Sequence, residues 1–221
     1  MRSLRRLIRE LRRKGFHFTG VIIPSVYCLG LKVPPPGALE PWLNQERAVL
    51  VLGVVTGLYF LVELIRLLDP ELNRAFVRQF RFLLRRSETH QVTGTGYYLL
   101  GAWLSVVLFP PTVAIAAMSF LIFGDVAAAL VGMAIGRVRI LGNKTLEGSL
   151  ACFVVCVAVG IALFSGAGWP HALILALTGA TVATTAELLP LWVNDNLTIP
   201  LLSGAALWLV ARAFEIPIPA L

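Results

Sequence analysis

Two long stretches of this 221-residue chain are almost free of charge, and they limit what it can fold into. Residues 91–136 contain one charged residue, Asp125, and residues 149–186 contain no acidic or basic residue apart from His171. Over the whole chain 57% of residues are hydrophobic and 14% are charged, against about 45–50% and about 25% in soluble domains. The composition therefore predicts an all-α, polytopic membrane protein that forms a single domain over residues 1–221.

Hydrophobic length predicts about seven transmembrane helices, because one crossing takes about 20 mostly apolar residues. Pro110-Pro111 divides the first uncharged stretch, and the segment 166–170 divides the second, since proline and glycine interrupt helices. The predicted spans are 16–32, 47–68, 95–109, 112–136, 149–166, 171–191 and 197–214.

The uneven distribution of positive charge predicts the orientation of the chain. The net charge is +7, and most of the 19 Lys and Arg residues lie in 1–14, 66–86 and 137–144, which seven spans would place on one side. By the positive-inside rule that side is cytoplasmic, so we expect a cytoplasmic N-terminus and an external C-terminus. The pattern favours anionic membrane lipids over nucleic acid as the partner. We expect a multi-pass protein of the cell inner membrane.

Two basic segments are predicted to form amphipathic helices on the cytoplasmic surface. In residues 1–15, leucine and isoleucine side chains share one helical face and arginines lie opposite. In residues 69–86, Asp69-Pro70 supplies a cap and a first-turn proline, and an apolar stripe and an arginine stripe follow. Both patterns are typical of interfacial helices on anionic lipid. The alternative is that these charges only set the topology.

Asp125 is the first candidate for a functional residue, because polar groups inside a membrane are costly. An unpaired carboxylate at this depth would be neutralised or would need a cation. Gly132 and Gly136 follow at i+7 and i+11, on the same helical face, and form a smooth groove toward the cytoplasm. Packing of small residues against a neighbouring helix is the alternative explanation for the glycines, but it does not explain the aspartate.

The loop 137–148 is predicted to bind an anion. Lys144 precedes the helix that opens near Ser149, so an ammonium group, free backbone N–H groups and a helix dipole coincide there. Gly148 permits close approach, and Thr145 or Ser149 adds a hydroxyl group. A basic topology signal combined with a helix cap is the alternative.

Further polar residues lie near the ends of the last two spans. Glu187 is followed by Asp195 and Asn196 in the next loop. The two carboxylates could hold magnesium or act as a base. The alternative for Asn196 is that it only caps the last span.

The first two spans also carry charged residues at their predicted cytoplasmic ends. Lys14 and His17 begin the first span, where an interfacial role is the alternative to catalysis. Glu63 and Arg66 are three residues apart on a helix, and we expect them to form a structural ion pair.

The motifs, and the order in which they follow one another along the chain, resemble those of the CTP-dependent lipid kinase family. That family contains dolichol kinase, phytol kinase and the fungal CTP-dependent diacylglycerol kinase. The resemblance extends from residue 13 to about residue 204. The matching segments are Arg13-Lys14-x-x-His17, Glu63-x-x-Arg66, Glu88 to Thr93-Gly94, Gly124-Asp125 to Gly136, Lys144-Thr145-x-Glu147-Gly148-Ser149, and Asp195-Asn196-x-Thr198-x-Pro200.

The resemblance implies that CTP, with Mg²⁺, donates its γ-phosphoryl group to the hydroxyl of a lipid alcohol (polyprenol, phytol or diacylglycerol) at a site facing the cytoplasm. It implies catalytic roles for Asp125, Lys144, Glu187 and Asp195, with Asp125 and Asp195 as metal ligands. The residues implied in nucleotide binding are Gly132, Gly136, Lys144, Thr145, Glu147, Gly148, Ser149 and Asn196. Lys14, His17 and Thr93 are secondary candidates.

Two other functions fit the same residues. A phosphatidate cytidylyltransferase-like enzyme would also use CTP and magnesium, but it would transfer CMP and release pyrophosphate. A small ion-coupled transporter would use the intramembrane carboxylates for proton coupling. Diacylglycerol, polyprenol and phytol all fit as acceptors by these residues, and CTP and ATP both fit as donors.

Overall fold

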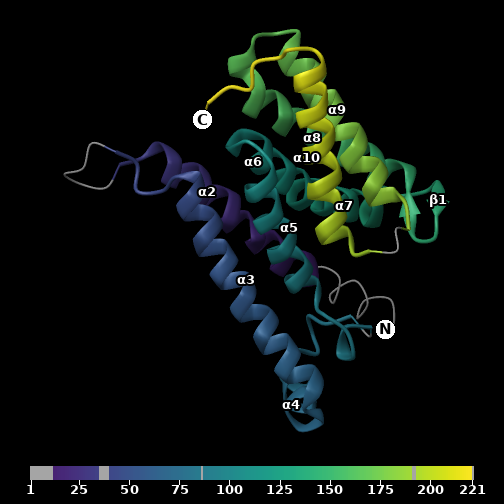
Figure 1. The fold of residues 1–221 in the computed structure, drawn as a ribbon. Helices are drawn as coiled ribbons and strands as arrows, with labels where there is room; N and C mark the ends of the chain where they lie inside the picture. The colour runs from purple at the N-terminus through teal and green to yellow at the C-terminus, as the bar shows by residue number, and fades with distance from the viewer. Residues whose placement is uncertain (1–11, 35–39, 86, 191–192, 221) are drawn as a thin grey trace.

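The computed structural model describes residues 12–34, 40–85, 87–190 and 193–220, and these form a helical bundle with one small hairpin (Figure 1). Residues 12–18 are helical and continue into the next two elements. The elements are η1 (Thr19–Val21), α2 (Ile22–Lys32), α3 (Gln45–Leu68), α4 (Pro70–Phe80), η2 (Ser87–Thr89), α5 (Gly94–Leu108), α6 (Pro111–Ser119), η3 (Phe120–Gly124), α7 (Asp125–Ile135), β1 (Arg139–Leu141), β2 (Lys144–Thr145), α8 (Leu146–Phe164), η4 (Ser165–Ala167), α9 (His171–Leu188) and α10 (Asp195–Ala213).

Five helical segments in the described part of the chain are long and apolar enough to cross a membrane. They are Gln45–Leu68, Pro111–Ile135, Leu146–Ala167, His171–Leu188 and Asp195–Ala213, and they correspond to five of the predicted spans. The other two predicted spans correspond to α5, a shorter apolar helix, and to the helical run 12–32. Seven crossings and their direction therefore stay predictions.

Helix α6 lies at the centre of the bundle. Every residue from Thr112 to Ser119 is buried, and the helix contacts α2, α5, α8 and α10. A helix that is apolar on all sides is expected in such a position. It continues through η3, a single π-helical turn, into α7. The ring of Phe120 fits against Gly179 of α9, where an added Cβ would lie 2.3 Å from it.

Helix α3 leans away from the bundle, with α5 and α4 as its main neighbours (Figure 1). Leu50, Val54, Leu58 and Leu61 on its surface are more than half exposed. In a chain of this hydropathy, such a surface is suited to contact with lipid.

Helix α4 confirms the predicted cap and corrects the predicted length. Asp69 accepts hydrogen bonds from the backbone N–H of Glu71 at 2.7 Å and of Leu72 at 3.2 Å. The predicted helix over 69–86 is too long, because α4 ends at Phe80. The chain turns there, and the Glu88 carboxylate accepts a hydrogen bond from Arg85 N at 2.6 Å. The other predicted amphipathic helix, 1–15, lies outside the described residues apart from 12–15.

The predicted loop 137–148 contains a short antiparallel hairpin followed by the first residues of α8. Arg139 in β1 pairs with Thr145 in β2, and Gly142 at the tip has a φ of +55°, a conformation that glycine adopts without strain. The open end of the hairpin is fixed, because the Glu147 carboxylate accepts a hydrogen bond from Val138 N at 3.2 Å. The following helices α8, α9 and α10 pack side by side (Figure 1).

Candidate active site

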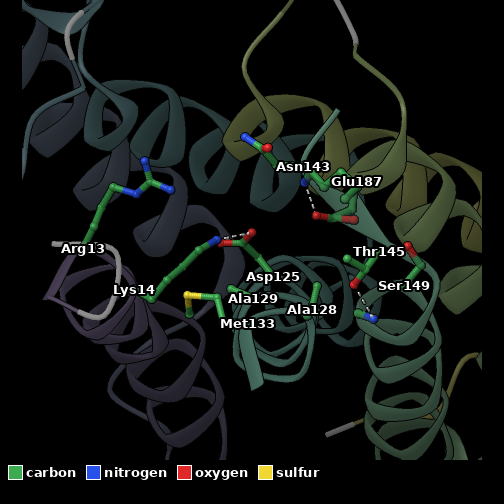
Figure 2. A pocket seen from close by; sticks show the side chains of 13 residues that line it. Arg13, Lys14, Asp125, Ala128, Ala129, Met133, Asn143, Thr145, Ser149 and Glu187 are labelled. Atoms are coloured by element: carbon green, nitrogen blue, oxygen red, sulfur yellow. Dashed lines mark hydrogen bonds and ion pairs between the residues drawn. The ribbon is translucent and has the colours of Figure 1, made fainter. Parts of the chain in front are cut away.

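A cavity of about 640 Å³ lies at one end of the bundle (Figure 2), within the range of about 300–1,000 Å³ that is typical of small-molecule sites. Its walls come from α7, α8, the end of α9, the hairpin and the helical residues before η1. The residues that line it are Arg13, Lys14, Asp125, Ala128, Ala129, Gly132, Met133, Asn143, Lys144, Thr145, Gly148, Ser149 and Glu187.

Asp125 begins α7, directly after the π-helical turn, and faces the first described helix. Lys14 Nζ donates a hydrogen bond to Asp125 Oδ1 at 2.5 Å, and Figure 2 shows the two side chains pointing toward each other. His17 Nε2 lies 3.6 Å from Asp125 Oδ2. The side chains of all three residues are less than one fifth exposed. Of the two expected outcomes for this carboxylate, neutralisation or a cation partner, the structure has the second, with Lys14 as the partner.

Lys144 faces Glu187 across the other side of the cavity. Its Nζ forms an ion pair with Glu187 Oε1. The Lys144 side chain is 37% exposed, whereas that of Glu187 is only 3% exposed. Within the described residues, neither Glu187 Oε2 nor the buried Ser149 Oγ has a hydrogen-bond partner. The sequence indicated Lys144 and Glu187 separately but gave no sign that they pair.

The glycines bring α7 and α8 into close contact. A Cβ on Gly148 would lie 2.7 Å from the carbonyl oxygen of Ala128, and a Cβ on Gly132 or Gly136 would lie within 3.0 Å of Thr145 Oγ1. Thr145 also caps α8 by accepting a hydrogen bond from Gly148 N at 3.2 Å. The packing and capping alternatives therefore describe part of the role of these residues. Gly132, Gly148 and Thr145 line the cavity as well, while Gly136 is not among its lining residues.

Two residues assigned to nucleotide binding have structural contacts instead of a place in the cavity wall. Glu147 holds the hairpin through Val138 N. Asn196 Nδ2 donates a hydrogen bond to Gly94 O at 2.8 Å and so links α10 to α5. The suggestion that Asn196 caps the last span is wrong. Asn194 does so by accepting a hydrogen bond from Asn196 N at 3.0 Å, because the helix begins at Asp195, two residues before the predicted span.

Asp195 lies close to the cavity but is not among the residues that line it. Its carboxylate lies within range of the charges of Lys144, Arg85, Asp125 and Lys14. Its role as a metal ligand or base stays a prediction.

The Glu63–Arg66 ion pair is confirmed, and it belongs to a larger buried cluster. Arg66 donates a hydrogen bond to Glu63 Oε2 at 2.6 Å, to Asn73 Oδ1 at 2.8 Å and to Gln91 O at 3.0 Å. Both charged side chains are 3% exposed. Thr93 belongs to the same cluster, since its Oγ1 donates to Glu63 Oε1 at 3.2 Å. The cluster joins α3, α4 and the start of α5, and Thr93 does not line the cavity.

The residues present fit a magnesium ion that enters together with a phosphate ligand. In the part of the chain that the structure describes, no three His, Cys, Asp or Glu side chains gather to form a metal site by themselves. Mg²⁺ usually binds through one or two carboxylates together with substrate phosphates and water. Asp125 and Glu187 line one cavity, and Glu187 Oε2 lacks a partner among the described residues.

The fold and the cavity define a multi-pass membrane protein with a charged site at one end of its bundle. The chain is 31% identical to CTP-dependent diacylglycerol kinase 1 of Schizosaccharomyces pombe, over 75% of this chain and 81% of that protein. It is 28% identical to the protein of the same name from Saccharomyces cerevisiae, over 93% of this chain and 75% of that protein. An uncharacterized protein of Rickettsia prowazekii is 29% identical over 87% of this chain and 90% of its own length.

This chain therefore belongs to the CTP-dependent lipid kinase family. No family model matches it. No solved structure matches it either.

Proposed function

We propose that this protein transfers the γ-phosphoryl group of CTP to the hydroxyl group of a lipid alcohol at the cytoplasmic leaflet. The observation that carries the proposal is the cavity that brings Asp125 and Lys144 together in a chain built of apolar helices. The relatives named CTP-dependent diacylglycerol kinase support CTP as the donor. They favour diacylglycerol over polyprenol or phytol as the acceptor.

The triphosphate would lie at the start of α8. Backbone N–H groups at a helix N-terminus attract anions, and the cavity wall there also carries Lys144 and the hydroxyl groups of Thr145 and Ser149. The Ser149 hydroxyl is buried and has no partner among the described residues, so it is available to a phosphate oxygen. Arg13 and Lys14 add two further cationic side chains to the wall.

The lipid acceptor would reach the cavity along α7. Met133 lines the cavity and is 39% exposed, and the nearby Leu130 and Ile135 are exposed apolar side chains of the same helix. This surface allows the acyl chains to stay in the membrane while the hydroxyl group reaches Asp125. Such a sideways approach suits an acceptor that cannot leave the lipid phase.

In the reaction, the acceptor hydroxyl oxygen forms a bond to the γ-phosphorus while the bond from that phosphorus to the β–γ bridging oxygen breaks, and CDP leaves. Asp125 orients the hydroxyl group and accepts its proton, and Lys144 balances the charge that builds on the phosphate oxygens. Phosphoryl transfer depends mainly on such positioning and charge stabilisation. Mg²⁺ bound with the nucleotide supplies further neutralisation of the phosphate oxygens.

A labelling experiment tests the proposal. Purified protein is incubated with Mg²⁺, γ-labelled CTP or ATP, and diacylglycerol, a polyprenol or phytol. We expect label from CTP in the lipid fraction, with diacylglycerol as the best acceptor. Label released as pyrophosphate would instead indicate a cytidylyltransferase, and no transfer to any lipid alcohol would overturn the proposal.

Two variants test the assigned residues. Asp125→Asn and Lys144→Ala should each lower transfer on the order of 100-fold or more, because each removes a group that acts on the reacting atoms. Glu71→Gln and Lys32→Ala are matched controls, since both side chains are exposed, and they should transfer at the wild-type rate. Full turnover in both Asp125→Asn and Lys144→Ala would show that the site lies elsewhere.

A further inference from the structure

The two lysines in the described wall of the cavity are both paired with carboxylates. Lys14 pairs with Asp125, and Lys144 pairs with Glu187. A triphosphate binds best where positive charge is not already compensated, so the opening of one pair would add a lysine to Arg13 for its binding. The Lys144 side chain is 37% exposed and that of Lys14 is 12% exposed. Lys144 is therefore the one that is better placed to move to a phosphate.

Glu187 cannot remain alone when Lys144 leaves. Its side chain is 3% exposed, and its Oε2 has no hydrogen-bond partner among the residues that the structure describes. A buried carboxylate without a counter-charge is strongly disfavoured. The departure of Lys144 therefore requires a proton or another cation to take its place on Glu187.

We infer that Glu187 is a ligand for a divalent cation, and that Lys144 covers this ligand until a nucleotide binds. Lys144 then moves to the phosphate, and the cation that accompanies the phosphate replaces it on Glu187. The buried Ser149 hydroxyl, which has no partner in the described wall of the same cavity, can donate to a phosphate oxygen and at the same time accept a hydrogen bond from a water molecule on that cation. The inference rests on the proposed function, because a phosphate is what draws Lys144 away.

The local structure lets Lys144 move without disturbing the bundle. Lys144 lies beside the Gly142–Asn143 tip of the hairpin, where both tip residues are exposed. The base of the hairpin is held separately, by the Thr145 cap on α8 and by the bond from Val138 N to Glu147. A change of side-chain rotamer at Lys144 is therefore sufficient, and Glu187 stays fixed on α9.

The test measures Mn²⁺ binding in the absence of nucleotide and lipid. Full-length protein in detergent micelles is titrated with Mn²⁺, and free Mn²⁺ is followed by its electron paramagnetic resonance signal. Lys144→Ala should bind Mn²⁺ about tenfold or more tightly than the wild type, because the competing ammonium group is gone. The double variant Lys144→Ala/Glu187→Gln should lose this gain. Lys32→Ala, which removes an exposed lysine, should bind Mn²⁺ like the wild type.

A Lys144→Ala variant with wild-type Mn²⁺ affinity would overturn the inference, and so would a double variant that keeps the gain. This readout is separate from the transfer reaction. If Lys144→Ala shows no gain in Mn²⁺ affinity while the wild-type protein phosphorylates lipid, only the assignment of Glu187 as a cation ligand is refuted. If Lys144→Ala shows the gain in Mn²⁺ affinity while the wild-type protein transfers no phosphoryl group, only the proposed function is refuted.

Glu187→Gln provides a second test that does not depend on the folding of Lys144→Ala. Here Lys144 is unpaired from the start and the cation ligand is weakened. Without divalent cation, in EDTA, this variant should bind CTP more tightly than the wild type. The gain in CTP affinity on adding Mn²⁺ should be about tenfold smaller than in the wild type. An unchanged gain would contradict the role of Glu187.

Discussion

Replacing Gly148 by alanine should separate α7 from α8 and weaken the site. A Cβ at this position would lie 2.7 Å from the carbonyl oxygen of Ala128 and 3.1 Å from Thr145 Oγ1. The first neighbour is backbone, so it cannot move aside like the end of a flexible side chain. Overpacking of this kind typically costs about 1–3 kcal/mol, which corresponds to a fall of about 2–12 °C in the unfolding midpoint for a chain of this size.

Two buried thiols make this change measurable. Cys152 and Cys156 on α8 are no more than 1% exposed, so a thiol-reactive dye reports the temperature at which α8 opens. A Cys28→Ser background removes the partly exposed third thiol. The same samples are assayed for phosphoryl transfer, which should fall because Lys144 lies only four residues before Gly148.

Gly57→Ala is the matched control for Gly148→Ala. Gly57 lies on the exposed side of α3, and no atom lies within 4 Å of an added Cβ. The substitution should therefore stabilise the helix, by about 0.4–1 kcal/mol, and leave transfer unchanged. If Gly148→Ala unfolds at the wild-type temperature with wild-type turnover, the close contact of α7 and α8 at this point is refuted.

Two further predictions concern stability. Arg66→Met leaves Glu63 buried without its cation and should cost about 3–5 kcal/mol, while Glu63→Gln/Arg66→Met should cost less in the same thermal assay. Equal midpoints for the single and double variants would argue against a coupled buried pair. Asn194→Ala removes the side-chain cap of α10 and should cost about 1 kcal/mol, whereas Asn194→Asp keeps an acceptor and should be milder. A greater loss in the aspartate variant would contradict the cap.

The sequence predicted the apolar helices because hydrophobic length is a local property. Five of the predicted spans correspond to segments that can cross a membrane. The cap at Asp69 and the pair of Glu63 with Arg66 were also predicted, since each depends on residues within one turn. Local patterns also singled out Asp125 and Lys144, which line one cavity.

The missing parts of the site depend on partners that are distant in sequence. Lys14 lies 111 residues from Asp125, and Lys144 lies 43 residues from Glu187, so no periodicity could pair them. The chain turns after Phe80, where Leu83 N and Leu84 N donate to Phe80 O, and the periodicity of 69–86 gave no sign of this turn. Asn194 and Asn196 are both plausible caps by residue type, and only the position of the first helical turn decides between them.

The π-helical turn between Phe120 and Gly124 has a consequence for comparing related chains. Such a turn contains one residue more than an α-helical turn, and each residue advances an α-helix by about 100°. A chain with one residue fewer here would form a regular α-helical turn and keep Asp125 on the same face, because the wider turn accommodates the extra residue. A single gap in an alignment at this turn would therefore leave the proposed site geometry unchanged, whereas a gap in the regular part of the helix before Asp125 would turn Asp125 away from Lys14.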